Sequence, residues 1–208
     1  MKIILIGKGG HSKVIKDMID LQPSLEIVGY LDQKYPTASW QDGVFYGPMT
    51  AASSFTEDVK FVIAVGDNQI RKRIYIDLKM KENRFATIIH PTAIISPSAK
   101  IGYGTVIMAS VVIQADAIIG AHTIINTAAV IEHDNVIANY AHISPQATLT
   151  GTVSIEEGVH IGAGAIVIPG IHIGAWSIIG AGATVIHNLP SLCTAVGVPA
   201  RLLDNMEE

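Results

Sequence analysis

Aliphatic side chains recur at every sixth position through the second half of the chain. From Ile89 to Val185, seventeen consecutive positions spaced six residues apart are Ile, Leu or Val. A small residue stands two positions before most of them, and glycine follows several. This period fits neither an α-helix nor a regular strand, but it fits a short strand plus a corner. Three such units would close a triangular coil of about 18 residues with the aliphatic side chains inside.

The first half of the chain has a different pattern. Strands are predicted at Lys2–Ile6, Glu26–Leu31 and Phe61–Val65, with helices over Val14–Leu21 and Gln69–Lys81. Strands that alternate with helices indicate a small parallel α/β domain. We therefore divide the chain into an α/β domain (1–89), a coil domain (90–188) and a tail (189–208). The first domain could cap one end of the coil stack, and the tail could cap the other end or leave it open.

A glycine-rich turn, Gly7-Lys8-Gly9-Gly10-His11-Ser12, follows the first strand. Such a turn at a helix N-terminus lets backbone N–H groups approach a phosphate. The dinucleotide fingerprint requires a third glycine at position 12, where Ser12 stands, so NAD binding is disfavoured. The turn could also be a tight strand-to-helix connection that binds nothing.

Several segments together resemble the bacterial sugar O-/N-acetyltransferases of the hexapeptide-repeat superfamily. They are GKGGHS, YLD, AVGDNQIRKRI, the HPTAIISPSA entry to the repeat and the closing VGVPAR. The family includes sialic-acid O-acetyltransferases and UDP-4-amino-sugar N-acetyltransferases. The resemblance implies a Rossmann-like first domain, a left-handed parallel β-helix, and a homotrimer with active sites between subunits.

The same resemblance implies which residues bind the nucleotide sugar. The residues expected to line its pocket come from the first domain: Gly9, Gly10, His11, Asp32, Gly66, Asp67, Asn68 and Arg71. Arg71 could pair with a phosphate, and Asp32 could accept hydrogen bonds from a ribose or a uracil. Asn126 is implied as a further substrate or positioning contact.

Acetyl transfer needs a base that accepts a proton as the acceptor attacks the thioester, and histidine suits that role. Seven of the eight histidines lie at or after position 90. We choose His133, because the stretch from Asn126 to Asp134 resembles the catalytic segment of the family. Asp134 would orient the imidazole and stabilise its cation. Without that resemblance, His133 would be read as a histidine on a solvated corner.

An 18-residue coil places Gly151 one coil from His133, about 5 Å along the stack. A glycine there would let the thioester approach, and a backbone N–H could stabilise the oxyanion. His142 is implied as an active-site residue that meets acetyl-CoA. Acetyl-CoA would follow the wall near the C-terminal coils, at the corners that contain Gly162 and Ala163, and Gly180 and Ala181. The same glycines could serve only the corner geometry.

Charge limits how the ligands could be held. The formal net charge is −4, which disfavours nucleic acid as a partner. Twelve of the 14 Lys and Arg lie in residues 1–89, and only Lys100 and Arg201 lie beyond. Arg201 is therefore a candidate contact for the CoA phosphates.

The apolar stretch 161–186 has six glycines, a proline and no helical period, so we expect no membrane insertion and a cytoplasmic protein.

The expected activity is therefore acetyl-CoA-dependent acetylation of a sugar amino or hydroxyl group in glycan or polysaccharide biosynthesis, with a UDP-4-amino-sugar as the first candidate. A sialic-acid O-acetyltransferase is the alternative within the family. Two other classes stay open. One is a zinc-dependent hydratase that uses His142 and His160, and the other is a nucleotide-sugar-binding protein without catalysis. For the acetyltransferase itself we expect no metal.

Overall fold

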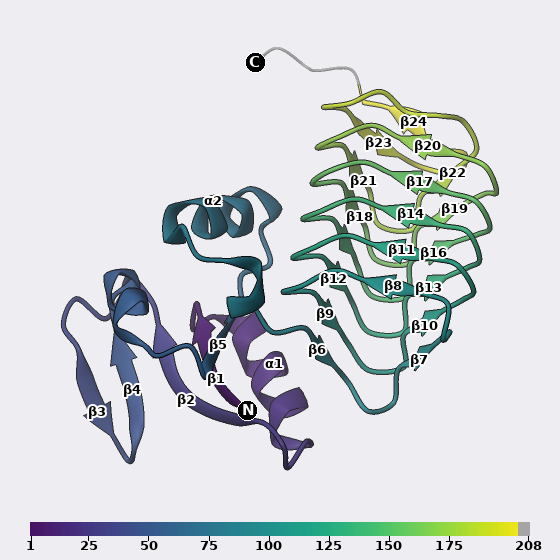
Figure 1. Cartoon of the computed structure of the whole chain (residues 1–208). Helices are drawn as coiled ribbons and strands as arrows, with labels where there is room; N and C mark the ends of the chain where they lie inside the picture. The colour runs from purple at the N-terminus through teal and green to yellow at the C-terminus, as the bar shows by residue number, and fades with distance from the viewer. Residues whose placement is uncertain (204–208) are drawn as a thin grey trace, which may run out of the picture.

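In the computed structural model, which describes residues 1–203, an α/β domain lies against the side of a long triangular β-helix (Figure 1). Residues 204–208 of the predicted tail lie outside the described residues. The first domain contains the following elements: β1 (Lys2–Ile6), α1 (Gly10–Asp20), β2 (Glu26–Leu31), β3 (Ser39–Gln41), β4 (Val44–Gly47), a 3₁₀ turn (Met49–Ser54), β5 (Val59–Ile63), α2 (Asn68–Leu78) and a second 3₁₀ turn (Glu82–Arg84).

The first domain is built on a five-stranded sheet in the order β3-β4-β2-β1-β5. All neighbours are parallel except β3, which pairs with β4 in the antiparallel direction. The prediction of a parallel α/β domain is confirmed. Helix α1 begins at Gly10, four residues earlier than expected. The sequence pattern missed β3 and β4 because both strands are short, and β3 is also exposed along its whole length.

The β-helix has three faces, each a sheet of short strands that are parallel except for the last strand, β24. The first, which we call the docked face, contains β6 (Ile88–Ile89), β9 (Val106–Ile107), β12 (Ile124–Ile125), β15 (His142–Ile143), β18 (His160–Ile161), β21 (Ile178–Ile179), β23 (Thr194–Val196) and the antiparallel β24 (Arg201–Leu202). The six-stranded face contains β7 (Ile94–Ile95), β10 (Val112–Ile113), β13 (Val130–Ile131), β16 (Thr148–Leu149), β19 (Ile166–Val167) and β22 (Thr184–Val185). The five-stranded face contains β8 (Lys100–Ile101), β11 (Ile118–Ile119), β14 (Val136–Ile137), β17 (Ser154–Ile155) and β20 (His172–Ile173).

The predicted inward positions form the core of this prism. Every sixth residue from Ile107 to Val185 is at most 2% exposed, and each pairs with the residue eighteen positions away, as Ile131 does with Leu149. The chain visits the three faces in turn, so this domain is a parallel β-helix. Ile89 remains 36% exposed, so the first coil is less completely covered than those that follow.

Each corner of the prism contains a residue in the left-handed region of the backbone. From Gly104 to Gly182, one residue in every six has a φ between 52° and 74°, and most of these residues are not glycine. L-residues adopt this conformation at a cost of about 1 kcal/mol or more. The stacked neighbours therefore hold Asp134, Tyr140 and Trp176 in a conformation that each would otherwise avoid.

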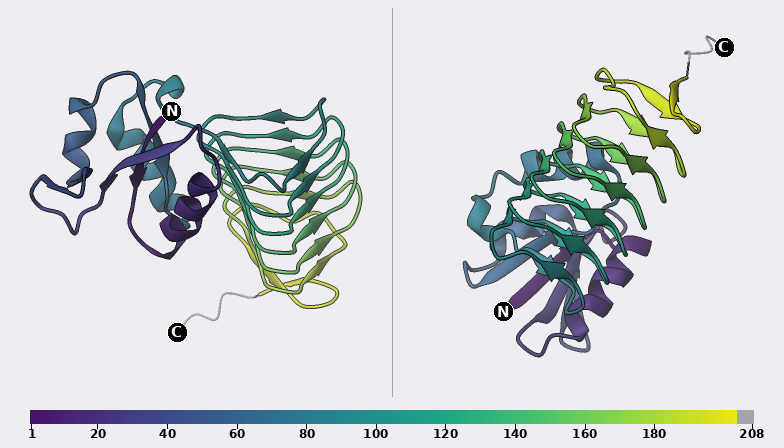
Figure 2. Two further views of the ribbon diagram at one scale, coloured as in Figure 1. Left: turned by 90° about the horizontal axis from the view of Figure 1, so that it is seen from below. Right: turned by 90° about the vertical axis from the view of Figure 1, so that its right-hand side faces the viewer.

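The first domain packs against the docked face and does not cap the end of the stack, which corrects one expectation. The outward side chains of Ile88, Val106 and Ile124 are buried with Ile3 and Ile15 of the first domain. Figure 2 shows the α/β domain beside the early coils rather than across their open end. The aliphatic residues on this one face therefore fix where the first domain sits.

Strand pairing also moves both domain boundaries. Strand β6 pairs with β9 in the β-helix, so the second domain begins two residues before position 90. Strands β23 and β24 extend the docked face through Leu202, so the described part of the tail covers the last coil. These strands belong to the β-helix because they complete its hydrogen bonding.

We expect the inward residues to dominate the stability of the β-helix. Ile155→Ala should lower the free energy of unfolding by about 2–5 kcal/mol, because its side chain is 1% exposed in a packed interior. The adjacent, outward-facing Ser154 provides the control, and Ser154→Ala should cost less than about 1 kcal/mol. Denaturant unfolding of both variants tests this, and equal losses would contradict the assigned strand orientation.

Candidate active site

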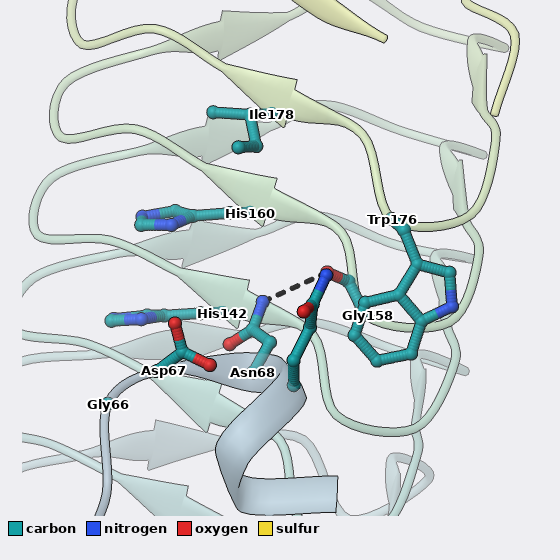
Figure 3. Close-up of a pocket in the computed structure, with 9 residues that line it drawn as sticks. Gly66, Asp67, Asn68, His142, Gly158, His160, Trp176 and Ile178 are labelled. Atoms are coloured by element: carbon teal, nitrogen blue, oxygen red, sulfur yellow. Dashed lines mark hydrogen bonds between the residues drawn. The ribbon is translucent and has the colours of Figure 1, made fainter. Parts of the chain in front are cut away.

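A cavity of about 410 Å³ lies between the beginning of α2 and the docked face. Its lining residues are Gly66, Asp67, Asn68, Gln69, His142, Gly158, His160, Trp176 and Ile178. Figure 3 shows His142, His160 and Ile178 one above another on successive coils, with Asp67 and Asn68 at the start of the helix beside them. Both domains therefore contribute walls to one cavity.

The first domain brings its polar loops to this cavity through the direction of its strands. Because β1 and β5 are parallel neighbours, the loops that follow them leave the same edge of the sheet. Asp67 caps α2, and its carboxylate accepts a hydrogen bond from the Ile70 N–H at 2.8 Å. The Asn68 side chain donates to the carbonyls of Gly158 and Val159 at 3.0 and 3.2 Å. The loop 66–68 is thus tied directly to the β-helix.

His142 has a defined hydrogen-bond partner on the coil below. The Thr127 N–H donates to Asn126 Oδ1 at 2.8 Å, which directs the Asn126 Nδ2 group toward His142 Nε2, 3.1 Å away. Because Nδ2 can only donate, Nε2 accepts and the ring proton lies on Nδ1. Among residues 1–203, that buried Nδ1 has no hydrogen-bond partner.

Burial keeps the imidazoles around the cavity neutral. Burial, followed by the neighbouring His160 and Arg71, lowers the pKa of His142 to about 3. Burial and the charge of Arg71 lower the pKa of His11 to about 4. The His142 and His160 rings stack with centroids 4.9 Å apart, and His160 Nε2 lies 2.9 Å from Ser144 Oγ. Within the described part of the chain, the buried Nε2 of His11 also has no hydrogen-bond partner.

His133 lies on a different corner of the prism. Its side chain is 59% exposed, and Nδ1 is 2.8 Å from Asp134 Oδ2. The predicted stacking with Gly151 is present, since a Cβ on Gly151 would come within 2.7 Å of the imidazole. A larger residue at 151 would therefore displace the His133 ring.

The predicted site residues form two separate groups in one chain. His133 lies at the corner between the six-stranded and five-stranded faces, after β13 and before β14. His142 lies on the docked face, which is the side of the triangle opposite that corner. A single prism therefore keeps His133 away from His142, Asn126 and the first domain.

The corner between the docked and six-stranded faces is open near its C-terminal end. A Cβ added to Gly164 or Gly182 would meet nothing, and Ala163 and Ala181 are exposed. Gly162 and Gly180 are packed instead, and a Cβ on Gly162 would lie 2.5 Å from the Ala181 nitrogen. Arg201 is exposed on β24, where its Nη1 donates to the Ala200 carbonyl at 3.0 Å. The open wall predicted for a pantetheine chain is therefore present as a surface.

Arg71 does not occupy the position predicted for it. Its side chain is 1% exposed and donates to main-chain carbonyls of both domains, so it is unavailable to a phosphate. The prediction that Arg71 pairs with a phosphate was wrong, because the helix directs this residue into the domain interface.

Asp32 and the glycine turn follow β2 and β1 and do not line this cavity. Asp32 accepts hydrogen bonds from the N–H groups of Lys8 and Lys34 at 2.6 and 3.0 Å. With Gln33, it lines a second cavity of about 240 Å³ whose other walls are largely aliphatic. Gly9 and Gly10 are exposed, and a Cβ on either would meet nothing. This edge therefore remains open to a ligand.

Sequence reasoning did not assign Gly158, Trp176 and Ile178 to the cavity. The 18-residue spacing contained the signal, since Ile178 follows His160 by one coil, as His160 follows His142. Trp176 follows Gly158 by one coil in the same way, and its ring covers that glycine. What the period did not show was which of the three faces the first domain would cover.

Among residues 1–203, no group of three or more His, Cys, Asp or Glu side chains is placed to hold a metal ion. No helix in that range is long and apolar enough to cross a membrane.

Similarity to known proteins identifies the class of this protein as an acyltransferase built on hexapeptide repeats. Residues 2–78 match the PglD N-terminal domain family, and residues 152–187 match the family described as bacterial transferase hexapeptide (six repeats). The acetyltransferase domain of PglB from Neisseria gonorrhoeae, solved with acetyl coenzyme A, is 35% identical with a TM-score of 0.88, and the match covers 97% of this chain and 98% of that one. The perosamine N-acetyltransferase PerB from Caulobacter crescentus, solved with CoA and GDP-perosamine, is 34% identical with a TM-score of 0.88, and the match covers 98% of both chains.

A further relative is the UDP-N-acetylbacillosamine N-acetyltransferase of Bacillus subtilis (strain 168). It is 49% identical over 105 residues, so the match spans about half the length of each chain. The chain belongs to the hexapeptide-repeat sugar acetyltransferase family that has a PglD-type N-terminal domain. The predicted fold and family are thus confirmed.

We expect acid to destabilise the protein through its buried histidines. Burial lowers the pKa of His122 to about 3, as it does for His142, whereas an unfolded histidine titrates near 6.5. The stabilising contribution is therefore complete above pH 6.5 and is lost as the pH falls toward the folded-state values. For each such histidine, the free energy of unfolding should fall by up to about 1.4 kcal/mol for every unit by which the pH drops in that range.

Thermal unfolding at pH 7.5, 6.0 and 5.0 measures this effect. His122 is surrounded by Tyr75, Phe85, Tyr103 and Tyr140, and within residues 1–203 neither ring nitrogen has a partner. His122→Phe should therefore flatten the pH dependence. An unchanged slope in that variant would show that the acid sensitivity has another origin.

Proposed function

We propose that the protein transfers an acetyl group from acetyl-CoA to the amino group of a nucleotide-linked amino sugar. Relatives similar over nearly the whole chain were solved with acetyl coenzyme A, or with CoA and GDP-perosamine. A UDP-4-amino-sugar is the first acceptor to test, since the relative from Bacillus subtilis is a UDP-N-acetylbacillosamine N-acetyltransferase. Localisation in the cytoplasm is proposed with this activity, because both acetyl-CoA and nucleotide sugars are cytoplasmic metabolites.

His133 pairs with Asp134 and its ring stacks on Gly151, and this arrangement supports the proposal. The acceptor nitrogen would attack the acetyl carbonyl carbon while His133 Nε2 removes its proton. The C–S bond then breaks, and the departing thiolate receives a proton. Asp134 stabilises the imidazolium that forms between these steps. Within the described residues, the Gly151 N–H donates to no backbone carbonyl, so it is free to bind the oxyanion.

We further propose that the active site is completed by a second copy of the chain in a trimer. His133 and Gly151 lie opposite the face that contains His142 and the first domain, so one subunit alone does not join them. The two uncovered faces also expose aliphatic side chains, such as Ile166 and Val136 at 44% and 46%. Apolar faces of this kind are suited to subunit packing.

In this arrangement, acetyl-CoA would lie along the open corner that contains Ala163 and Ala181. Asn126 and His142 begin the same edge, and Arg201 lies near its C-terminal end. The nucleotide sugar would extend from the glycine turn and Asp32 past His11 to the loop Gly66–Asn68. Its amino group would then reach the His133 of a neighbouring copy.

The first prediction from this proposal concerns the base. His133→Ala should lower kcat by about 10²–10⁴-fold, equivalent to about 3–5 kcal/mol of transition-state stabilisation, with little change in substrate affinity. Asp134→Asn should have a smaller effect because the base remains. His172 is a matched control, since it is also exposed and lies 3.2 Å from Glu156. Thiol release measures turnover, and a His133→Ala enzyme that retained a third of wild-type kcat would remove His133 from the mechanism.

A second prediction tests the shared site. Co-expressed His133→Ala and His142→Ala chains should form mixed trimers in which some interfaces combine an intact His133 with an intact His142. Random assembly at equal amounts makes about a quarter of the interfaces complete. Activity should therefore rise above that of both parents toward about a quarter of wild type. Activity no higher than the mean of the parents would place the site within one subunit.

A further inference from the structure

Arg71 connects the two domains through main-chain carbonyl groups. Its Nη1 donates to Val65 and Gly66 of the first domain at 3.1 and 3.0 Å. Its Nε donates to His122 at 2.7 Å, and Nη2 donates to Tyr140 at 2.7 Å, both in the β-helix. Nη2 also donates to Asn68 Oδ1 at 2.8 Å and to the Ala141 carbonyl at 3.3 Å. One planar guanidinium therefore bridges both sides of the interface.

Carbonyl and amide oxygens and the field of the nearby Asp67 carboxylate together stabilise the charge of Arg71. Among the described residues, none of the salt bridges includes Arg71, although its side chain is 1% exposed. A buried cation is costly unless its donors are satisfied, and here carbonyl and amide oxygens surround the guanidinium. These oxygens accept hydrogen bonds from the guanidinium N–H groups, which explains how the charge can stay buried. They also make the position specific for arginine, because the donors of arginine lie in a fixed plane.

The oxygens that Arg71 holds are next to the residues that line the cavity. Gly66 and Asn68 form one wall, and both are hydrogen-bonded to the guanidinium. On the other wall, the Ala141 carbonyl immediately precedes His142. Displacement of Arg71 would therefore change the separation between the loop 66–68 and the His142 ring.

The positive charge of Arg71 also acts on the imidazoles of His142 and His160. The groups that face His142 are His160 on the next coil, Arg71 on α2, His11 on α1 and the carbonyl of Gly66. Arg71 and His11 disfavour a proton on His142, whereas the Gly66 carbonyl favours it. Asp67 acts in the opposite sense to Arg71 at His160. Burial is the largest cause for both histidines, and Arg71 adds to it.

We propose that Arg71 is a positioning residue for acetyl transfer, which clamps the loop 66–68 against the coil of His142 and so sets the distance between acceptor and donor. This inference rests on the proposed acetyltransferase function. It predicts that weakening the clamp affects turnover and acceptor binding, because a displacement of about 1 Å at a reacting centre can cost 10²-fold. Binding of acetyl-CoA should be much less affected, because His142 is the one expected acetyl-CoA contact that adjoins the clamp, and the others lie along the corner that contains Ala163 and Ala181.

The test compares Arg71→Lys and Arg71→Gln with Lys72→Met. Lys72 is the next residue of α2 and also joins the domains, through an ion pair with Glu157. Lysine at 71 keeps the charge but cannot donate to both domains in one plane. Arg71→Lys should therefore lower kcat by about 10- to 100-fold and raise KM for the nucleotide sugar, with KM for acetyl-CoA within about threefold of wild type. Lys72→Met should leave all three parameters within about threefold.

A histidine titration by NMR separates positioning from simple loss of stability. In Arg71→Gln the buried positive charge is gone, so the pKa of His142 should rise and its ring should titrate at a higher pH than in wild type. Lys72→Met should leave that titration unchanged. If Arg71→Gln does not fold, the kinetics of Arg71→Lys decide the matter.

The outcomes distinguish the two proposals. A wild-type enzyme that acetylates none of the amino-sugar nucleotides would overturn the proposed function, whatever the variants do. An active wild type with Arg71→Lys kinetics within twofold of it would overturn the clamp alone. Equal effects of Arg71→Lys and Lys72→Met on kcat would reduce Arg71 to an ordinary interface residue.

Discussion

The six-residue register of the β-helix is the constraint on which the rest of the structure depends. Each coil buries its aliphatic side chains only against the coils above and below, so strands must stack with a shift of eighteen residues. This register forces one left-handed residue at every corner and sorts the outward positions into fixed columns. His142, His160 and Ile178 share one column, while His133 and Gly151 share another. Every functional contact of the second domain is therefore decided by its position within the repeat.

The second structural requirement is the attachment of the first domain to one face. Aliphatic outward residues on the early coils, such as Val106 and Ile124, make that face the place where the α/β domain packs. Above them, the outward positions become His142 and His160, and the packed interface changes into a polar cavity. The change from Ile to His along a single column thus separates the region that binds the domain from the region that can bind a ligand.

The interface between the domains is polar where it borders the cavity. Arg71 and Asn68 donate hydrogen bonds to carbonyl groups of the β-helix. Directional bonds of this kind fix orientation more narrowly than apolar contacts do. Under the proposed function such a fixed relation would favour acetyl transfer, because reaction requires close approach of two atoms.

Local spacing in the sequence is enough to predict the repeat, the parallel α/β domain and the stacking of Gly151 on His133. It also predicts that His142 and His160 lie one coil apart. The three-dimensional packing was needed to show that the first domain covers the docked face, which leaves His133 on the corner opposite that domain. It alone showed that Arg71 bridges the domains instead of meeting a phosphate. A basic residue on a helix has the same local pattern whether it faces a ligand, solvent or another domain. The choice depends on long-range packing between segments such as Ile15 and Ile124, which no local period records.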